Sequence, residues 1–356
     1  MKKLMLLAAT ASVALVGCVN DEKMEMTSEA QKISFDNPVM NTQTRAEVNG
    51  EITVAAYPES EKFVVYAMHS ATELTLSTWA NGTNFWGTDG TNGLTVQKEA
   101  DGDWEHVTKD YYWPKDGYLS FAAYSPAGLN DGGTVTYGNN GWTVTDFTVN
   151  GTVGSQIDLM CATPVFNQQE PETETGVPTV FKHVLSSIVF TAVENDDAYT
   201  YKINSIKVSG NIAMEGNMSS TITGELNDLS MTFAWGHNGQ SATSLNKALS
   251  FDVPVGSNGF FLSGTDALLL IPQDNIGNVE VTLNISRTAA ATSATEPAYN
   301  KTVKLSDFKI SASENTVTKW EAGKRYVYNF TIGGTKKIFF TPSVTEWEDV
   351  TLNVEI

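Results

Sequence analysis

The chain has 356 residues, and 22 Lys and Arg stand against 41 Asp and Glu, for a formal net charge of −19. This acidity makes nucleic acid and anionic membrane surfaces poor partners, and it says nothing about the fold. Only 18% of the residues are charged, and Gly, Thr, Ser and Asn are plentiful. The composition favours an extracellular all-β protein over a cytosolic helical enzyme, and the length allows two domains.

The first 18 residues have the pattern of an export signal. Lys2 and Lys3 form a basic region, and the apolar stretch at 4–16 is too short to span a bilayer stably. The stretch ends in Leu-Val-Gly-Cys, which resembles a bacterial lipobox. We therefore predict a lipoprotein signal peptide at residues 1–17 and lipidation of Cys18; the alternative is an ordinary signal peptide with a chance cysteine.

Residues 18–45 are predicted to be a tether that carries a removable strand. Ile33 and Phe35 alternate with polar neighbours, which indicates a short strand that ends near Pro38. The following segment is small and polar and holds a single arginine, Arg45, and proteases cut segments of this kind. We predict processing between Arg45 and Ala46.

Turn clusters divide the remainder into strand-length segments, and no long stripe of helical period is visible. We expect strands at 52–56, 63–68, 94–98, 110–113, 119–124, 134–137 and 143–149, then at 179–193, 201–208, 231–235, 249–254, 267–272, 279–285, 300–305 and 326–332. The segment 179–193 changes phase at Ser186 and Ser187, which suggests a bulge. The acidic stretch 167–176 is the best linker, so we predict β-sandwich domains with Greek-key connections at 46–172 and 173–356.

The segment 350–356 is a strict apolar and polar alternation. Its apolar positions are Val350, Leu352, Val354 and Ile356, which would share one face of a strand. Chain ends are usually polar and frayed. A strand of this kind needs a sheet edge and a core, either in its own domain or in another molecule.

No catalytic or metal-binding pattern is present in the sequence. The four histidines, His69, His106, His183 and His237, are far apart and form no zinc motif. Cys161 with His183 could form a thiol pair, but a lone Cys in an apolar strand is most often part of a core. Residues 99–103 have a hint of a calcium loop but lack its spaced ligands, so we favour a hairpin turn. We therefore predict no enzyme, no metal and no cofactor.

Three aromatic residues lie in Asn-Gly-Thr loops, where sugar-stacking aromatics sometimes lie. These are Trp79, Phe85 and Trp86, and we expect them to be mainly core because strands bury aromatic residues. The alternative function is a surface lipoprotein that does not polymerise and binds a glycan or host ligand through them.

The body of the chain also resembles the fimbrillin-like proteins of Bacteroidales. The matching segments are Tyr111-Tyr112-Trp113-Pro114 with Phe121-Ala122-Ala123-Tyr124-Ser125-Pro126, Asp158-Leu159-Met160, Phe181-Lys182-His183-Val184-Leu185-Ser186, Leu269-Leu270-Ile271-Pro272-Gln273, Trp320-Glu321-Ala322-Gly323-Lys324-Arg325-Tyr326-Val327-Tyr328 and Ile338-Phe339-Phe340-Thr341-Pro342-Ser343-Val344 with Trp347. These segments, together with the lipobox, Arg45 and the C-terminal segment 350–356, occur in the same order as in the family.

The resemblance implies two transthyretin-like β-sandwich domains in the lipoprotein precursor of a type V pilus subunit, displayed at the outer membrane and cell surface. An arginine-specific protease would cut after Arg45 and release the strand that holds Ile33 and Phe35. The C-terminal strand of a neighbouring pilin subunit, of the same or another kind, would then fill the groove by strand addition. The family includes shaft, tip and anchor subunits, and a usable Arg45 argues against the anchor, which would keep its lipid.

Overall fold

The computed structural model describes residues 31–36, 38–41, 54–87, 92–129, 133–172, 176–195, 198–237, 267–307, 317–333 and 338–346. Over these ranges the protein consists of β-strands and short 3₁₀ turns, such as η1 (Trp79–Asn81), η3 (Val153–Ser155) and η5 (Leu305–Asp307). The all-β prediction is therefore confirmed. None of the helices among the described residues has the length and apolarity needed to cross a membrane.

The strands up to residue 183 belong to the N-terminal half of the molecule. They are β1 (Val39–Asn41), β2 (Val54–Ala56), β3 (Phe63–Ser70), β4 (Thr83–Asn84), β5 (Leu94–Lys98), β6 (Trp104–His106), β7 (Tyr118–Ser125), β8 (Thr134–Gly138), β9 (Gly141–Thr148), β10 (Met160–Ala162), β11 (Val165–Gln168) and β12 (Val180–His183).

The remaining strands follow residue 185. They are β13 (Ser186–Asn195), β14 (Tyr199–Ser209), β15 (Glu215–Glu225), β16 (Asp228–Gly236), β17 (Leu268–Leu270), β18 (Glu280–Ala289), β19 (Tyr299–Lys304), β20 (Lys324–Gly333) and β21 (Ile338–Glu346).

Two sheets build the N-terminal half. The larger has the order β2-β1-β12-β10-β7-β3-β5-β6, with β11 beside β7 and β4 beside β3, and the smaller has the order β16-β15-β9-β8. Trp142 of β9 fills the space between them: its side chain is fully buried, and its Nε1 donates a 3.0 Å hydrogen bond to the carbonyl oxygen of Ala162 in β10. Tyr66 on β3 also joins the two sheets, since its hydroxyl donates to the carbonyl oxygen of Val135 at 2.8 Å.

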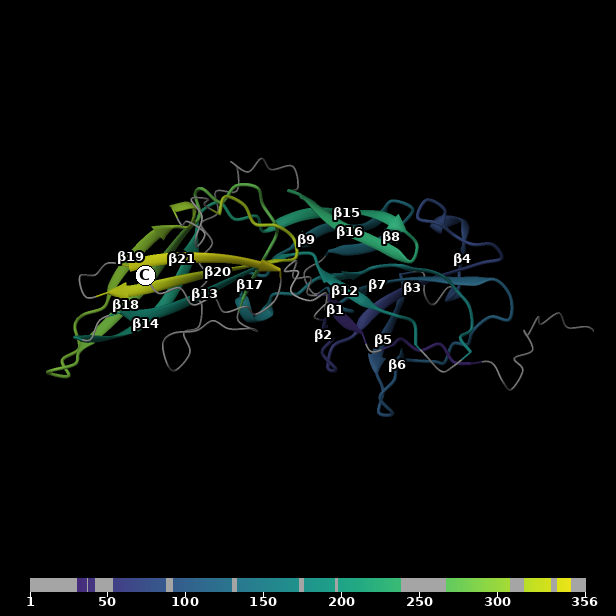
Figure 1. Cartoon of the computed structure of the whole chain (residues 1–356), viewed down its shortest axis with the longest axis horizontal. Coiled ribbons are helices and arrows are strands. Elements are labelled where there is room, and N and C mark those ends of the chain that lie inside the picture. Colours follow the sequence, from purple (N-terminus) through teal and green to yellow (C-terminus); the bar gives the residue numbers. More distant parts are fainter. Residues whose placement is uncertain are drawn as a thin grey trace, which may run out of the picture.

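The C-terminal half is a second pair of sheets, with orders β17-β13-β20-β21 and β14-β18-β19. Alternate residues of β13, β14, β18 and β20 are buried in one apolar cluster, as their period-2 patterns require. Within it the rings of Phe190 and Phe330 stack at a centroid distance of 5.8 Å. Figure 1 shows the two halves side by side along the long axis of the molecule.

The hairpin of β15 and β16 comes from the second half of the chain but extends a sheet of the first half. β15 pairs with β9, and Met218 lies opposite Val144. Figure 1 shows the hairpin beside β8 and β9. The backbone N–H of Trp142 also donates to Ser220 Oγ at 2.8 Å. This hairpin therefore ties the two halves together.

The segment 179–193, expected as one strand with a bulge, is two strands in two sheets. β12 pairs with β10 and β1 in the N-terminal half, and β13 pairs with β17 and β20 in the C-terminal half. The phase change predicted at Ser186 and Ser187 therefore marks the start of β13, after the chain has left the first sheet. The predicted strand 110–113 forms only an isolated bridge, between Tyr112 and Lys32, and the predicted strand 249–254 lies outside the described residues.

Candidate functional site

Residues 31–36, called here the plug, lie extended in a groove of the N-terminal half. Phe35 pairs antiparallel with Trp104 of β6 and parallel with Val177, which precedes β12. β6 is the end strand of its sheet, and β12 lies near the other end. The plug therefore closes a gap between distant strands of one curled sheet.

The backbone of the plug is held on both sides. On one side, Ile33 N–H donates to Tyr111 O at 2.8 Å and Phe35 N–H donates to Trp104 O at 2.9 Å. On the other, Asp36 N–H donates to the carbonyl oxygen of Val177 at 3.0 Å, and Val177 N–H donates to Ser34 O at 2.8 Å. This pattern is that of a strand inserted between two neighbours.

The apolar side chains of the plug complete a core. Ile33 and Phe35 are 4% and 5% exposed and belong to a cluster distinct from the one that fills the rest of the molecule. The Phe35 ring meets Phe63 and Phe121 edge to face, at 5.8 and 5.9 Å between centroids. A residual cavity of about 10 Å³ lies beside these residues, too small to hold a water molecule comfortably, so the plug fills its groove.

Gly176 makes room for the plug. A Cβ atom at this position would lie 2.1 Å from the backbone nitrogen of Asp36 and 2.4 Å from the carbonyl carbon of Phe35. Because these neighbours are backbone atoms, no side-chain rotation could relieve the overlap. The close approach therefore requires glycine here.

A second strand follows the plug before the predicted cut. β1 runs parallel to β12, with Val39 opposite Val180, and it separates β12 from β2. Tyr57, next to β2, donates its backbone N–H to Pro38 O at 2.9 Å, and its ring stacks on Phe181 of β12 at 5.1 Å. The sequence predicts a strand that ends near Pro38 and does not predict β1, because two apolar residues after a proline give no visible alternation.

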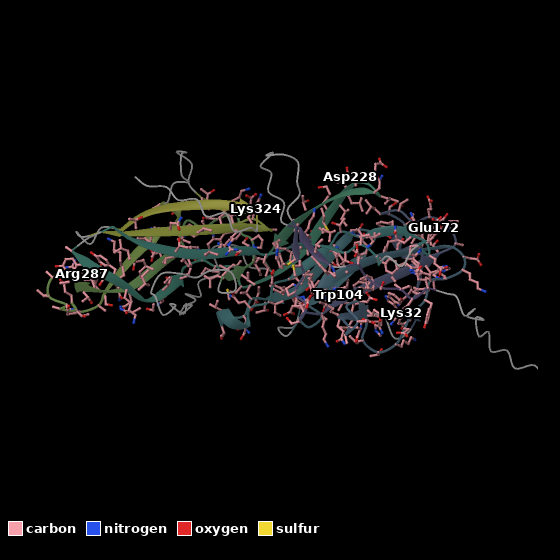
Figure 2. The ribbon with its side chains drawn as sticks, turned by 60° about the horizontal axis from the view of Figure 1, so that its bottom comes forward. Lys32, Trp104, Glu172, Asp228, Arg287 and Lys324 are labelled. Atoms are coloured by element: carbon pink, nitrogen blue, oxygen red, sulfur yellow. The ribbon has the colours of Figure 1, made fainter. Side chains whose placement is uncertain are left out.

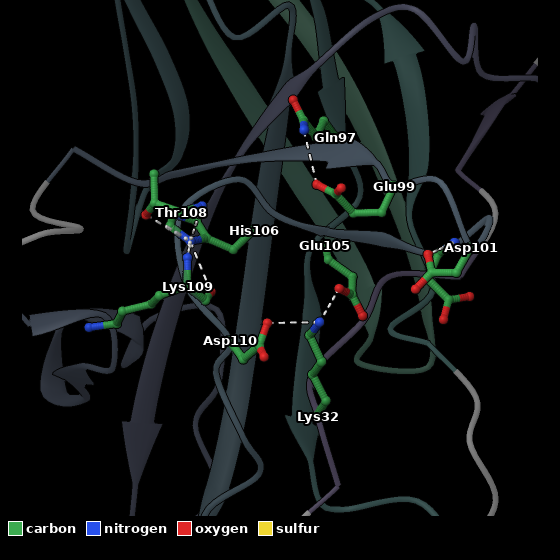
Figure 3. Close-up of polar contacts among 10 residues, drawn as sticks. Lys32, Gln97, Glu99, Asp101, Glu105, His106, Thr108, Lys109 and Asp110 are labelled. Atoms are coloured by element: carbon green, nitrogen blue, oxygen red, sulfur yellow. Dashed lines mark hydrogen bonds and ion pairs between the residues drawn. The ribbon is translucent and has the colours of Figure 1, made fainter.

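The plug also forms two ion pairs through Lys32. The Lys32 ammonium contacts the carboxylate of Glu105 and lies 2.8 Å from Asp110 Oδ1, and Figure 3 shows it between the two acids. Partial burial acts to lower the pKa of Lys32, but its hydrogen bonds to Asp110 and Glu105 outweigh this and raise that pKa above its ordinary value. Lys32 therefore stays charged. Figure 2 shows Lys32 and Trp104 in the same half of the molecule, away from Arg287 at the opposite end.

The predicted lipidation, processing and donor-strand residues lie beyond the described ranges. These are Cys18, Arg45, Ala46, Val350, Leu352, Val354 and Ile356. Of the predicted processing and exchange residues, the structure therefore places Ile33 and Phe35 only.

Cys161 and His183 do not form a catalytic pair. Cys161 lies opposite Lys182, and His183 lies opposite Met160, so the Cys161 and His183 side chains point to opposite faces of the sheet. Cys161 is fully buried, which raises its thiol pKa, and His183 Nδ1 lies 2.9 Å from Asp158 Oδ1. The predicted core position of Cys161 is confirmed.

The loop aromatics are part of the cores. Trp79 and Trp86 are 3% and 5% exposed and belong to different apolar clusters, while Phe85 is half-buried beside Trp86. Trp86 Nε1 donates a 3.0 Å hydrogen bond to Val65 O. The predicted core role is confirmed for the two tryptophans, which offer no exposed ring face on which a sugar could stack.

Residues 99–103 form the predicted hairpin turn between β5 and β6. Glu99 N–H donates to Asp103 O at 2.8 Å, and Gly102 has a φ of +104°, which glycine adopts readily. Within the described part of the chain, no three His, Cys, Asp or Glu residues are grouped so that they could hold a metal ion.

The fold and site together define an all-β protein in which an N-terminal segment completes the core of the first sandwich. Residues 26–347 match the model of the fimbrillin-like family, and the chain therefore belongs to that family. No curated protein is significantly similar to it in sequence.

Solved structures with the same fold come from Bacteroides species. A fimbrial protein from Bacteroides vulgatus is 17% identical, with a TM-score of 0.52, and the match covers 89% of this chain and 100% of that protein. A protein from Bacteroides ovatus that is assigned to cell adhesion is also 17% identical, with a TM-score of 0.52 and coverage of 92% and 100%. At this identity the likeness shows the fold, an assembly of β-sandwiches.

Proposed function

We propose that this protein is a structural or tip subunit of a type V fimbria that serves adhesion. It is exported as a lipoprotein through Cys18, cut after Arg45 and assembled at the cell surface by strand exchange. Membership of the fimbrillin-like family supports the fimbrial role. The observation that carries the mechanism is the plug: a segment on the N-terminal side of Arg45 supplies a buried part of the core through Ile33 and Phe35.

Cutting after Arg45 would allow both the plug and β1 to leave. Their departure would uncover the edge of β6, the edge of β12 and the apolar floor beneath Phe35. Open edges above an exposed core favour the addition of a strand. An uncut precursor would keep this surface covered until export is complete.

The C-terminal strand of a neighbouring subunit, of the same or another kind, is the proposed replacement, and in a neighbour of the same kind this strand is the segment 350–356. Val350, Leu352, Val354 and Ile356 would enter at alternate positions, as Ile33 and Phe35 do. Burial of four such side chains would contribute on the order of 6–12 kcal/mol before ordering costs, at roughly 1.5–3 kcal/mol each. Backbone hydrogen bonds on both sides would slow dissociation, so the polymer should be kinetically stable.

Two sets of variants test the mechanism by the ladder of polymers on a denaturing gel run without boiling. Arg45→Ala and Arg45→Lys should both accumulate as uncut monomer, since an arginine-specific protease accepts neither. Deletion of 350–356 should give cut protein that cannot donate a strand, whereas Asn353→Ser, on the polar face of that strand, should polymerise normally. Wild-type ladders from an uncut Arg45 variant or from the deletion would rule out strand exchange.

A further inference from the structure

We propose that the plug groove selects an incoming strand that carries a Lys or Arg at the position of Lys32, and that the chain's own C-terminal strand is therefore a poor occupant. The partner would be the donor strand of a different subunit, defined by this positive charge. This inference rests on the strand exchange proposed above and concerns its specificity.

The wall of the groove contains a buried acid. Glu105 of β6 is only 7% exposed, and the cation in contact with it is Lys32. Asp110 lies on the other side of the same ammonium, which it meets at 2.8 Å. Lys109 is directed elsewhere: its ammonium lies over the Tyr111 ring, 4.6 Å from the centroid, and points away from Lys32 in Figure 3.

Strand exchange would expose this acid to water and then bury it again. When the plug leaves, water can reach Glu105, and an incoming strand must exclude that water again. A buried carboxylate without a cation is strongly unfavourable, because it loses its hydration without gaining a partner. The nearby carboxylate of Asp110 adds like-charge repulsion. The groove therefore penalises any strand that does not replace the Lys32 ammonium.

The chain's own C-terminal segment carries no positive charge that could replace the Lys32 ammonium. Residues 346–356 contain no Lys or Arg and four acids, Glu346, Glu348, Asp349 and Glu355. With the apolar positions of 350–356 facing inward, the outward positions hold Thr351, Asn353 and Glu355. Reversal of the strand direction changes the order of these residues but brings no cation. Charge complementarity thus favours a donor from another subunit.

Peptide binding to the cut protein tests the inference. The full chain is cut at Arg45, the released segment is removed, and affinities are measured by fluorescence anisotropy. One labelled peptide has the sequence of residues 350–356, and three others carry Lys in place of Thr351, Asn353 or Glu355. Matched peptides with Gln at the same positions control for side-chain length. We expect one Lys peptide to bind at least about tenfold more tightly than its Gln counterpart.

Variants of the groove identify the source of the preference. Glu105→Gln should abolish it, and Asp110→Asn should weaken it; the Asp110 side chain is 52% exposed, so its replacement leaves the fold intact. Glu59→Gln is the control, since Glu59 pairs with Lys98 at an exposed site on the same half. Equal binding of Lys and Gln peptides, or a preference that survives loss of both groove acids, would overturn the inference alone. If no peptide binds, including one with the sequence of residues 31–36, strand exchange itself fails.

Discussion

The ring of Phe35 meets the ring of Phe63 edge to face, with 5.8 Å between centroids and an interplanar angle of 89°. Phe63 is fully buried on β3, in the middle of the large sheet, while Phe35 belongs to the segment that precedes Arg45. An aromatic pair of this geometry stabilises beyond the burial of its area. The core of the N-terminal half is thus complete only while the plug is in place.

Phe35→Ala should destabilise the uncut chain by about 3–5 kcal/mol, because it removes a buried ring and leaves a cavity. Ser34→Ala is the matched control on the opposite side of the plug, and it should change stability by less than about 0.5 kcal/mol. Denaturant unfolding of the uncut proteins measures both. A loss below about 1 kcal/mol for Phe35→Ala would show that the plug contributes little to the core.

Gly176→Ala should loosen the plug without a change in its sequence, because the new Cβ would overlap the backbone of Phe35 and Asp36. The rate of cleavage after Lys32 by a lysine-specific protease, which leaves Arg45 uncut, reports this, since paired backbone resists proteolysis. Gly151→Ala is the control, because a Cβ there would meet nothing within 4 Å. Equal protection of Lys32 in the two variants would contradict the tight fit inferred for Gly176.

Cys18→Ala should abolish lipidation and leave the protein out of the membrane fraction, because the thiol of Cys18 is the proposed site of attachment. Cys161→Ala removes the only other cysteine and should leave lipidation unchanged. Metabolic labelling with palmitate and detergent partitioning check both variants. Membrane partition of Cys18→Ala at the wild-type level would disprove the lipobox interpretation.

Cys161 should react slowly with a thiol probe in the native Cys18→Ala protein, because burial blocks access and raises its pKa. The rate should stay low between about pH 7 and 9 and rise sharply in guanidinium, where the thiol has its ordinary pKa of about 8.5. Since the folded state holds this proton more tightly, the contribution of Cys161 to stability falls as the pH rises above that value. Rapid labelling of the native protein at pH 7 would contradict the burial.

Sequence patterns predict a long strand with alternating apolar positions, such as β20, and they fail for β15, where the inward positions are mostly not apolar. β20 alternates aromatic residues with polar ones and was predicted within a few residues. β15 buries Gly216, Met218 and Ser220, so two of its three fully buried positions are not large apolar residues, and the strand was missed. The hairpin it forms is specified by tertiary pairing with β9 rather than by local pattern.

In the plug too, local sequence pattern predicts the apolar strand, whereas the contacts made through the fold are not predicted. The alternation of Ile33 and Phe35 pointed to a strand before Arg45, and the structure buries both side chains. The ion pairs of Lys32 could not be predicted, because Glu105 and Asp110 lie more than seventy positions away and only the fold brings them to the plug. The glycine at 176 was predicted only as part of a linker, since its role depends on the backbone that passes beside it.

The proposed domain boundary between residues 172 and 173 separates the N-terminal segment from strands that its sheets need. The strands that complete the N-terminal sheets come after it: β12 lies between β1 and β10, and β15 covers the edge of β9. Phe181 of β12 is fully buried in the apolar cluster that also holds Ile33 and Phe35. A fragment of residues 46–172 would therefore expose two sheet edges and part of both cores, and we expect it not to unfold cooperatively.

Circular dichroism melts and amide proton spectra of the fragment test this, with the full chain as the reference. A second fragment, residues 31–172, restores the plug but still lacks β12 and β15, and it should fail in the same way. Failure of both fragments would show that the missing strands, rather than the missing plug, prevent folding. A single cooperative melt and dispersed amide signals from residues 46–172 would instead establish an independent N-terminal domain that tolerates open edges, because its core would then be stable without Phe181 or the β15–β16 hairpin.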